Sequence, residues 1–214
     1  MSVEPLYGLR LRTPRLELRL GSREELLALG HLAREGIHPP EEMPFEVPWT
    51  DRSDKPGFAD DFVAYHEATL DAWNPESWSL NLLTFFGGSP VGTQSLRAER
   101  FATHREVDTG SWLGLAFQRR GLGTEMRAAV LELAFRGLGA RAATSSSFFG
   151  NESSKRVSEK LGYRVVGTST ATPRGETVSK YDLRIEREEW RCPFEVELEG
   201  VEPCLPLFGA TSAS

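Results

Sequence analysis

A glycine-containing run, Gln118-Arg119-Arg120-Gly121-Leu122-Gly123-Thr124, follows a predicted strand and opens a predicted helix. Glycine has no Cβ, so Gly121 and Gly123 let the backbone approach a ligand closely. The first N–H groups of a helix have no intrahelical partner, and the helix dipole adds partial positive charge there. Arg119 and Arg120 add two permanent positive charges beside these amides. The run therefore predicts a site for an anion such as a pyrophosphate.

Two common phosphate-binding motifs do not match this run. The dinucleotide fingerprint needs a third glycine, where this sequence has Met126, and an early parallel β-α-β unit followed by an acidic residue. A P-loop needs a Gly-Lys-Ser/Thr ending, which the run lacks. From these residues alone a simpler interpretation also stays open, namely two turn glycines that begin a helix.

Four further motifs occur in order along the chain: Leu11-Arg12-Thr13-Pro14-Arg15-Leu16, Gly110-Ser111-Trp112-Leu113, Asn151-x-x-Ser154 and Glu159-Lys160-Leu161-Gly162-Tyr163. Together with Gln118, Gly121 and Gly123 they resemble the GCN5-related N-acetyltransferase (GNAT) superfamily, and more closely its ribosomal-protein alanine acetyltransferase branch. The resemblance covers roughly residues 9–190. It implies an α/β (α+β) GNAT fold, in which helices flank a mixed, mostly antiparallel sheet that splays around an acyl-CoA site.

The resemblance implies that the chain binds an acyl-CoA, with acetyl-CoA as the default donor. Backbone amides of the glycine run would hold the pyrophosphate, and the pantetheine arm would lie against the strand that precedes it. The small residues from Ala142 to Ser147 agree with this, because they leave space beside that strand. Asn151 would hydrogen-bond the pantetheine, and Ser154 would lie near the thioester sulfur. The residues expected to bind acyl-CoA are Leu113, Leu115, Gln118, Arg119, Arg120, Gly121, Leu122, Gly123, Thr124, Asn151 and Ser154.

The implied reaction is direct transfer of the acyl group to a primary amine in a ternary complex. An alkyl amine with a pKa near 10 is only about one part in a thousand neutral at pH 7, so a base or a chain of waters helps. Asp108 stands where many relatives carry a glutamate, and it shares a strand face with Gly110 and Trp112. The alternative for Asp108 is a solvated carboxylate at a strand end. Glu99 and Glu106 are weaker candidates for the base.

A second catalytic role is that of the acid that protonates the leaving thiolate. Many relatives carry a tyrosine two residues before the Lys-Leu-Gly run, where this sequence has Ser158. Ser154 is therefore the candidate beside the leaving thiolate, and Tyr163 is expected to pack in the core. No serine or cysteine stands in a nucleophile-elbow context, so a covalent intermediate is not indicated. The four histidines are scattered without ligand spacing, and no metal site is expected: His31, His38, His66 and His104.

A proline-rich segment, residues 38–55, is expected to cover the acceptor side and to be irregular yet stiff. Aromatic residues in such a segment either fill a gap at the core edge or line a pocket. The candidates for acceptor binding are His38, Phe45, Trp49, Trp78 and Trp112. Three functions stay open: acylation of a small amine, acylation of a protein amine, and a non-catalytic acyl-CoA-binding module. Succinyl-CoA is a further donor candidate, because arginines could pair its carboxylate.

Length and composition set limits on these interpretations. The 214 residues fit one GNAT domain over residues 1–190 and a C-terminal extension over residues 191–214. A net charge of −6 argues against a general nucleic-acid binder, although 21 of the 25 basic residues are arginine. No apolar run approaches the roughly 20 residues of a membrane span, and no export signal is visible, so a cytoplasmic protein is expected. Cys192 and Cys204 are expected to be free thiols. A homodimer stays open.

Hydrophobic periodicity places these residues on elements. A strand with a bulge or an edge position near Thr13-Pro14 is expected over residues 8–20, followed by a helix that Ser22 and Glu25 cap and Gly36 ends. The later elements are expected to be a helix over 56–73, an antiparallel meander of strands over 78–86, 91–97 and 107–116, a helix over 121–136, a strand over 141–148, a helix over 151–161, and a hairpin of strands over 163–169 and 177–185. A short helix, a strand over 196–201 and a mobile end complete the chain.

Overall fold

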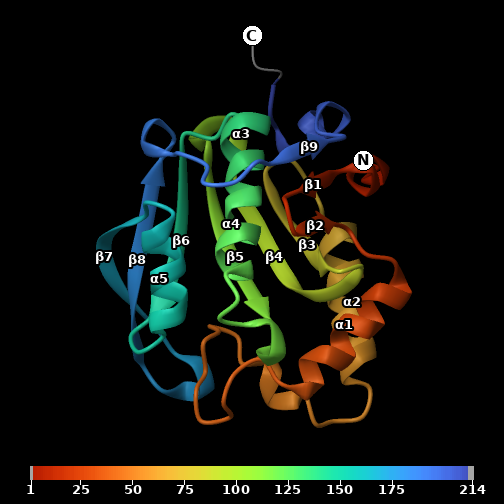
Figure 1. Ribbon diagram of the computed structural model, residues 1–214, viewed down its shortest axis with the longest axis vertical. Helices are drawn as coiled ribbons and strands as arrows, with labels where there is room; N and C mark the ends of the chain where they lie inside the picture. The colour runs from red at the N-terminus through yellow and green to blue at the C-terminus, as the bar shows by residue number, and fades with distance from the viewer. Residues whose placement is uncertain (1, 212–214) are drawn as a thin grey trace.

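The computed structural model describes residues 2–211, and it has one nine-stranded sheet with helices on both faces (Figure 1). The strand order is β7-β8-β6-β5-β4-β3-β2-β1-β9. The strands are β1 (Arg10–Arg12), β2 (Leu16–Arg19), β3 (Ser77–Phe86), β4 (Ser89–Glu99), β5 (Glu106–Leu113), β6 (Ala142–Phe148), β7 (Arg164–Ala171), β8 (Val178–Glu186) and β9 (Glu197–Glu199). The α-helices are α1 (Arg23–Glu35), α2 (Phe58–Asp71), α3 (Phe101–His104), α4 (Leu122–Glu132) and α5 (Glu152–Lys160).

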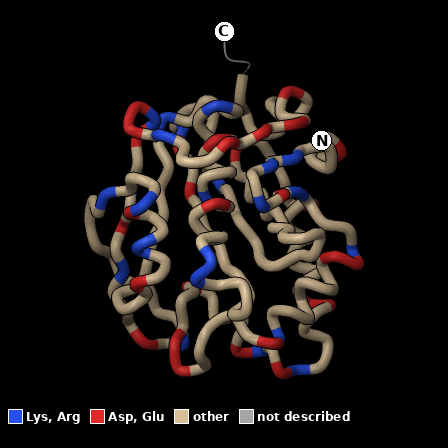
Figure 2. The backbone as a smooth tube through the Cα atoms, viewed as in Figure 1, with Lys and Arg blue, Asp and Glu red and all other residues tan. Residues whose placement is uncertain are grey.

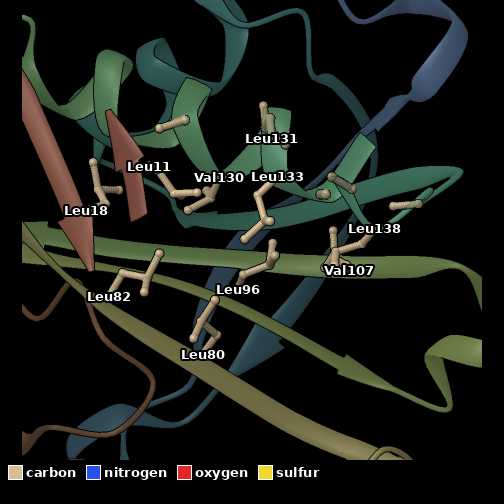
Figure 3. Close-up of a cluster of buried hydrophobic side chains, with 14 of the residues drawn as sticks. Leu11, Leu18, Leu80, Leu82, Leu96, Val107, Val130, Leu131, Leu133 and Leu138 are labelled. Carbon is tan, nitrogen blue, oxygen red and sulfur yellow. The ribbon is translucent and has the colours of Figure 1, made fainter. Parts of the chain in front are cut away.

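Successive residues of β3 point to opposite faces of the sheet and so divide the core in two. Leu80 and Leu82 belong to the larger cluster, which α4 completes, whereas Leu83 and Phe85 pack with α1 and α2. Figure 3 shows the larger cluster, in which leucines of the strands meet Val130 and Leu133 from α4 and the turn after it. The apolar stripe predicted for the helix over 121–136 therefore faces the sheet. After Glu132, α4 gives way to a π-helical turn, Leu133–Gly137.

The first strand predicted from the sequence is two strands. β1 and β2 pair antiparallel, with Leu11 opposite Leu18, and the Thr13-Pro14 step lies in the turn between them. Proline has no N–H to offer to a ladder, which is why the chain turns there instead of forming a bulge. The capping box at the next helix is as predicted: the Ser22 hydroxyl accepts from the Glu25 N–H, and the Glu25 carboxylate accepts from the Ser22 N–H.

The C-terminal segment packs onto the same core. β9 pairs with β1 at the sheet edge, with Leu198 opposite Leu11. The 3₁₀ segment Glu202–Phe208 buries its apolar side chains, and the Phe208 carbonyl accepts from the Trp78 indole N–H at 3.2 Å. Both cysteines are free thiols, as predicted. The last residues of the expected mobile end, 212–214, lie outside the described residues.

β5 and β6 are paired in parallel only at their beginnings. The pairs are Glu106 with Ala142, Val107 with Ala143, and Asp108 with Thr144, and beyond them the two strands separate. β5 nevertheless continues to Leu113 along β4, and β6 continues to Phe148 along β8. The sheet is thus split for part of its length, and α4 and α5 lie on one face of this split (Figure 1).

A buried carboxylate fixes the start of α4 to the N-terminal hairpin. Glu125 is 1 % exposed and accepts hydrogen bonds from the Thr13 hydroxyl at 2.6 Å, the Arg15 backbone N–H at 3.0 Å and the Arg15 Nε at 2.7 Å. Charged side chains are rarely this buried unless they are paired and hydrogen-bonded. Glu125 therefore sets the position of the first turn of α4 relative to β1 and β2.

We expect Glu125→Ala to lower the free energy of unfolding by about 2 to 3 kcal/mol, because it leaves several donors without an acceptor. The measurement is urea denaturation followed by circular dichroism. The exposed carboxylate Glu188 provides the control, and Glu188→Ala should change stability by less than about 0.5 kcal/mol. Equal stabilities of the two variants would show that Glu125 does not anchor the helix.

Candidate active site

The glycine run forms the loop before α4 and has an unusual backbone. Gly121 is the N-cap of α4 with φ +79°, and Arg119 has φ +57°, a left-handed conformation that few residues other than glycine adopt. Successive turns of this kind point backbone N–H groups into one concavity. Both arginines are exposed, and Figure 2 shows a basic stretch where α4 begins.

The backbone N–H groups of this loop have no partner among the described residues. No side chain caps α4, and after the Gln118 N–H the next one that donates is that of Glu125. The Gln118 side chain ties the loop to its surroundings, since its amide donates to the Ile37 and Leu113 carbonyls at 2.6 and 2.8 Å. A fixed loop with several unpaired amides can accept an anion, and the pyrophosphate role of Arg119–Thr124 stays a prediction.

The strand before the loop borders the split. Leu113 has its side chain in the core, and Leu115 is half-exposed, with its backbone N–H bonded to the Gly36 carbonyl. Leu122 is buried at the first turn of α4, and Gly123 and Thr124 are half-buried. The predicted pyrophosphate loop thus lies at the end of the strand that the pantetheine is expected to follow.

α5 packs beside β6, the second of the two strands that part. Asn151 is its N-cap, and the side-chain oxygen of Asn151 accepts from the Ser154 N–H at 3.1 Å and from the Ser153 hydroxyl at 3.0 Å. The Asn151 oxygen is therefore used by the helix, and the side-chain N–H₂ group is what Asn151 has to offer a ligand. Ser154 is half-buried one turn before Ser158.

Tyr163 lies in the core, as predicted. It is 3 % exposed, its hydroxyl is 3.1 Å from the Thr109 hydroxyl, and burial raises its pKa to about 12. The phenol therefore keeps its proton throughout the neutral range. The residue in the position of the relatives' tyrosine, Ser158, is fully buried and accepts a hydrogen bond from Arg127.

The candidate bases meet in one groove on the other face of the sheet. A groove of about 750 Å³ is lined by Asp108, Glu99 and Glu106, together with residues of α2, β3 and β4. Asp108 lies at the last paired position before the split, where it accepts from the Arg97 Nε at 2.7 Å and from the Thr144 hydroxyl at 3.0 Å. The Arg184 guanidinium holds the pKa of Glu106 below its usual range. Asp108 is therefore the carboxylate of the three that lies next to the split.

The aromatic residues of the proline-rich segment form a packed cluster. His38 contacts Phe45 with ring centroids 5.6 Å apart, Phe45 contacts Trp49 at 5.4 Å, and Trp49 contacts Trp112 at 5.6 Å. The His38 ring also bonds to the Thr50 hydroxyl and the Pro39 carbonyl. The structure therefore brings four of the five acceptor candidates together, but their side chains pack against one another and against α2.

Trp78, the fifth acceptor candidate, is at a different place. It is 3 % exposed, stacks on Trp73 and meets Phe208 edge-on at 4.8 Å. The remaining edge of Trp78 contributes to the groove that contains Asp108. The sequence alone could not separate these two locations, because both depend on contacts between distant segments.

Sequence reasoning missed the buried arginine of α4. Arg127 is 3 % exposed, and its guanidinium donates to serines of three different elements. A signal was present, because Arg127 directly follows Met126 within the apolar helix and has no carboxylate four residues away on the same helix. Glu125 was missed for the same reason. Both are charged residues of a helix that periodicity assigns to the core.

The fold thus combines two strands that part with a helix whose start offers unpaired backbone amides. The family model described as "Acetyltransferase (GNAT) domain" matches residues 15–164. This match covers well over half of the chain, and the chain belongs to the GNAT acetyltransferase family. The resemblance noted in the sequence is therefore confirmed.

Solved structures with the same fold include several acetyltransferases. RimJ of Mycobacterium smegmatis in complex with CoA-disulfide has a TM-score of 0.66 at 18 % identity, covering 86 % of this chain and 90 % of RimJ. The microcin C7 self-immunity acetyltransferase MccE in complex with acetyl-CoA and AMP has a TM-score of 0.65 at 14 % identity, covering 81 % and 93 %. A ribosomal-protein-S5-alanine acetyltransferase from Vibrio fischeri has a TM-score of 0.61 at 13 % identity, covering 85 % and 98 %. These likenesses confirm the predicted fold class.

Within residues 2–211 no three His, Cys, Asp or Glu side chains are arranged so that they could hold a metal ion. Over the same residues, none of the helices combines the length and apolar character needed to cross a bilayer.

We expect Gly121→Asp to weaken CoA binding at least tenfold, because it adds a negative charge where the loop amides would face phosphates. Isothermal titration with CoA measures the dissociation constant. Gly87→Asp is the matched control: Gly87 also has a positive φ, +59°, but lies in the β3–β4 turn with open space around its Cβ position. Both variants carry backbone strain. A loss of affinity in both would therefore show that the weaker CoA binding comes from lower stability and not from the loop.

Proposed function

We propose that the chain is an acyl-CoA-dependent N-acyltransferase that transfers an acyl group, by default acetyl from acetyl-CoA, to a primary amine. The observation that carries this proposal is the amide-rich loop Arg119–Thr124 at the end of a strand that has parted from its neighbour. The loop offers unpaired N–H groups to a pyrophosphate. The strand edge beyond Asp108 offers backbone groups to the amides of a pantetheine arm.

On the donor side, this chain's residues would bind and orient the acyl-CoA. The loop amides and Arg119 would hold the phosphates, while the Arg120 guanidinium lies over the Phe86 ring at 5.0 Å. The side-chain N–H₂ of Asn151 would donate to a pantetheine carbonyl, because the oxygen of that amide already caps α5. Ser154 would stand beside the thioester. These assignments rest on the family resemblance together with the positions of the residues around the split.

On the acceptor side, the groove with Asp108 would admit the amine. It lies on the face of the sheet opposite α4, so an amine bound there approaches the split from the side away from the loop. Asp108 would accept a proton from the attacking ammonium, directly or through water. Its pairing with Arg97 and Thr144 holds its carboxylate in place at the edge of the split.

The second candidate is a non-catalytic acyl-CoA-binding module. Two observations favour it: the Asp108 carboxylate is engaged by Arg97 at 2.7 Å, and Ser158 takes the place of the relatives' tyrosine acid. The Arg97 side chain is 60 % exposed, and an ion pair this accessible is worth little and opens readily. For this reason we favour the enzyme.

The experiment is thiol release, monitored with a thiol reagent, from acetyl-CoA and succinyl-CoA against panels of small amines and of peptides with free N-termini. Turnover with one panel identifies the acceptor class, and the ratio of kcat/KM for the two donors identifies the acyl group. Binding of both donors without acceptor-dependent release would support the binding module. Absence of both binding and release would overturn the proposal.

Once an acceptor is known, we expect Asp108→Asn to lower kcat about 10²-fold or more, with little change in the KM for the acyl-CoA, because Asp108 is assigned to the proton and not to the donor. Steady-state kinetics at saturating donor measure this. The control is Asp71→Asn, at the exposed end of α2. A kcat for Asp108→Asn equal to that of the control would remove Asp108 from the reaction.

A further inference from the structure

Arg127 is a buried cation without an anionic partner among the described residues. Its guanidinium donates to three hydroxyls: Nη1 to Ser145 at 3.1 Å and to Ser158 at 3.0 Å, and Nη2 to Ser111 at 2.9 Å. None of the ion pairs within residues 2–211 includes Arg127, and its Nε has no hydrogen-bond partner there. A buried charge is costly unless it is paired, and burial lowers the pKa of this guanidinium.

The position of Arg127 connects it with the split. Ser111 lies three residues after Asp108, the last paired residue of β5. Ser145 directly follows Thr144, the last paired residue of β6. The guanidinium therefore bridges the two strands just where they part, on the face covered by α4. Through Ser158 it also reaches α5, one helical turn from Ser154. The buried charge thus lies beside the place assigned above to the thioester.

The hydrogen bonds also determine which way the hydroxyl protons point. Because Arg127 donates to all three oxygens, each serine must use its own proton toward another acceptor. Ser145 donates to the Thr109 carbonyl at 3.0 Å, and Ser158 makes only a long contact of 3.4 Å with the Ser154 carbonyl. The half-buried Ser111 hydroxyl has no acceptor among the described residues. Ser111 is therefore the donor available beside a positive charge, because Ser158 is fully buried and its hydroxyl is directed at the Ser154 carbonyl.

We propose that Arg127, through the hydroxyl of Ser111, stabilises the thiolate that leaves during acyl transfer, an inference that rests on the proposed function. In that step the amine nitrogen bonds to the carbonyl carbon, and the C–S bond breaks with its electron pair left on sulfur. The extra proton of the amine passes to Asp108 or water. The Ser111 hydroxyl donates to the sulfur, and Arg127 is a positioning residue that directs this hydroxyl and adds its charge. This arrangement takes the place of the tyrosine acid.

The test needs no acceptor. The dissociation constants of CoA and desulfo-CoA are measured by titration calorimetry from about pH 6 to about pH 9, across the range in which a thiol ionises. The wild-type protein should come to prefer CoA by about tenfold as pH rises, which corresponds to one pKa unit of the bound thiol. Desulfo-CoA lacks the sulfur, so its dissociation constant measures the contribution of every contact except those made by the sulfur. Tyr163 does not titrate in this range, and Asp108 faces the other side of β5.

Arg127→Met, which is neutral and of similar length, should abolish the preference for CoA while the affinity for desulfo-CoA stays within about threefold. The control is Arg156→Met, at an exposed arginine of α5, which should keep the wild-type preference. A merely structural Arg127 would shift the melting temperature and both affinities together and leave their ratio unchanged. If Arg127→Met does not fold, the variant Ser111→Ala decides, since it keeps the charge and removes the donor.

The outcomes separate the two proposals. Equal affinity of the wild-type protein for CoA and desulfo-CoA at every pH, or a preference that survives Arg127→Met or Ser111→Ala, would overturn the thiolate role and leave the proposed function standing. Failure of the wild-type protein to bind either ligand would instead overturn the proposed function.

Discussion

The parting of β5 from β6 is the constraint on which the rest of the structure depends. Each of these strands is hydrogen-bonded on its outer side, β5 to β4 as far as Leu113 and β6 to β8 as far as Phe148. Because the outer neighbours hold both strands, the split cannot close by sliding one strand toward the other. Gly92 contributes to this, since a Cβ at this position of β4 would meet the Trp112 carbonyl oxygen at 2.2 Å. The exposed strand edges inside the split need partners, which a ligand with amide groups can supply.

Polar groups lie along the split: small hydroxyl residues line β6, and α4 contributes the Arg127 guanidinium. The buried charge costs stability relative to apolar packing. Its retention at the edge of a candidate active site is consistent with a functional role for the charge.

The elements could be predicted from the sequence because their signals are local. The Ser22–Glu25 capping box, the glycine turn between β3 and β4, and the helix start at Gly121 each depend on a few adjacent residues. The glycine loop of the site was predictable for the same reason. The Thr13-Pro14 step was expected to be a bulge or an edge position and is a turn, since these share residue types and only the antiparallel pairing of β1 with β2 separates them.

The contacts that satisfy buried charges could not be predicted from the sequence, because they join distant segments. Glu125 and Thr13 lie far apart in the chain, as do Arg127 and Ser158, and nothing in residue type or period links them. The groove around Asp108 has the same origin, because it forms only when α2, β3, β4 and β5 are in place. Periodicity assigns a residue to the core, but it does not say which partner makes a charge tolerable there.

The alternation of β5 gives the site two distinct sides. Thr109 and Ser111 face α4 and α5, where they meet Tyr163 and Arg127, whereas Asp108 faces the groove on the opposite side. On the proposed function, the base and the thiolate-stabilising charge are therefore separated by the strand itself. An amine that enters from the groove would push the electron pair of the C–S bond toward Arg127 on the far side. The separation also keeps Asp108 from pairing directly with Arg127, which would neutralise both groups before any substrate arrives.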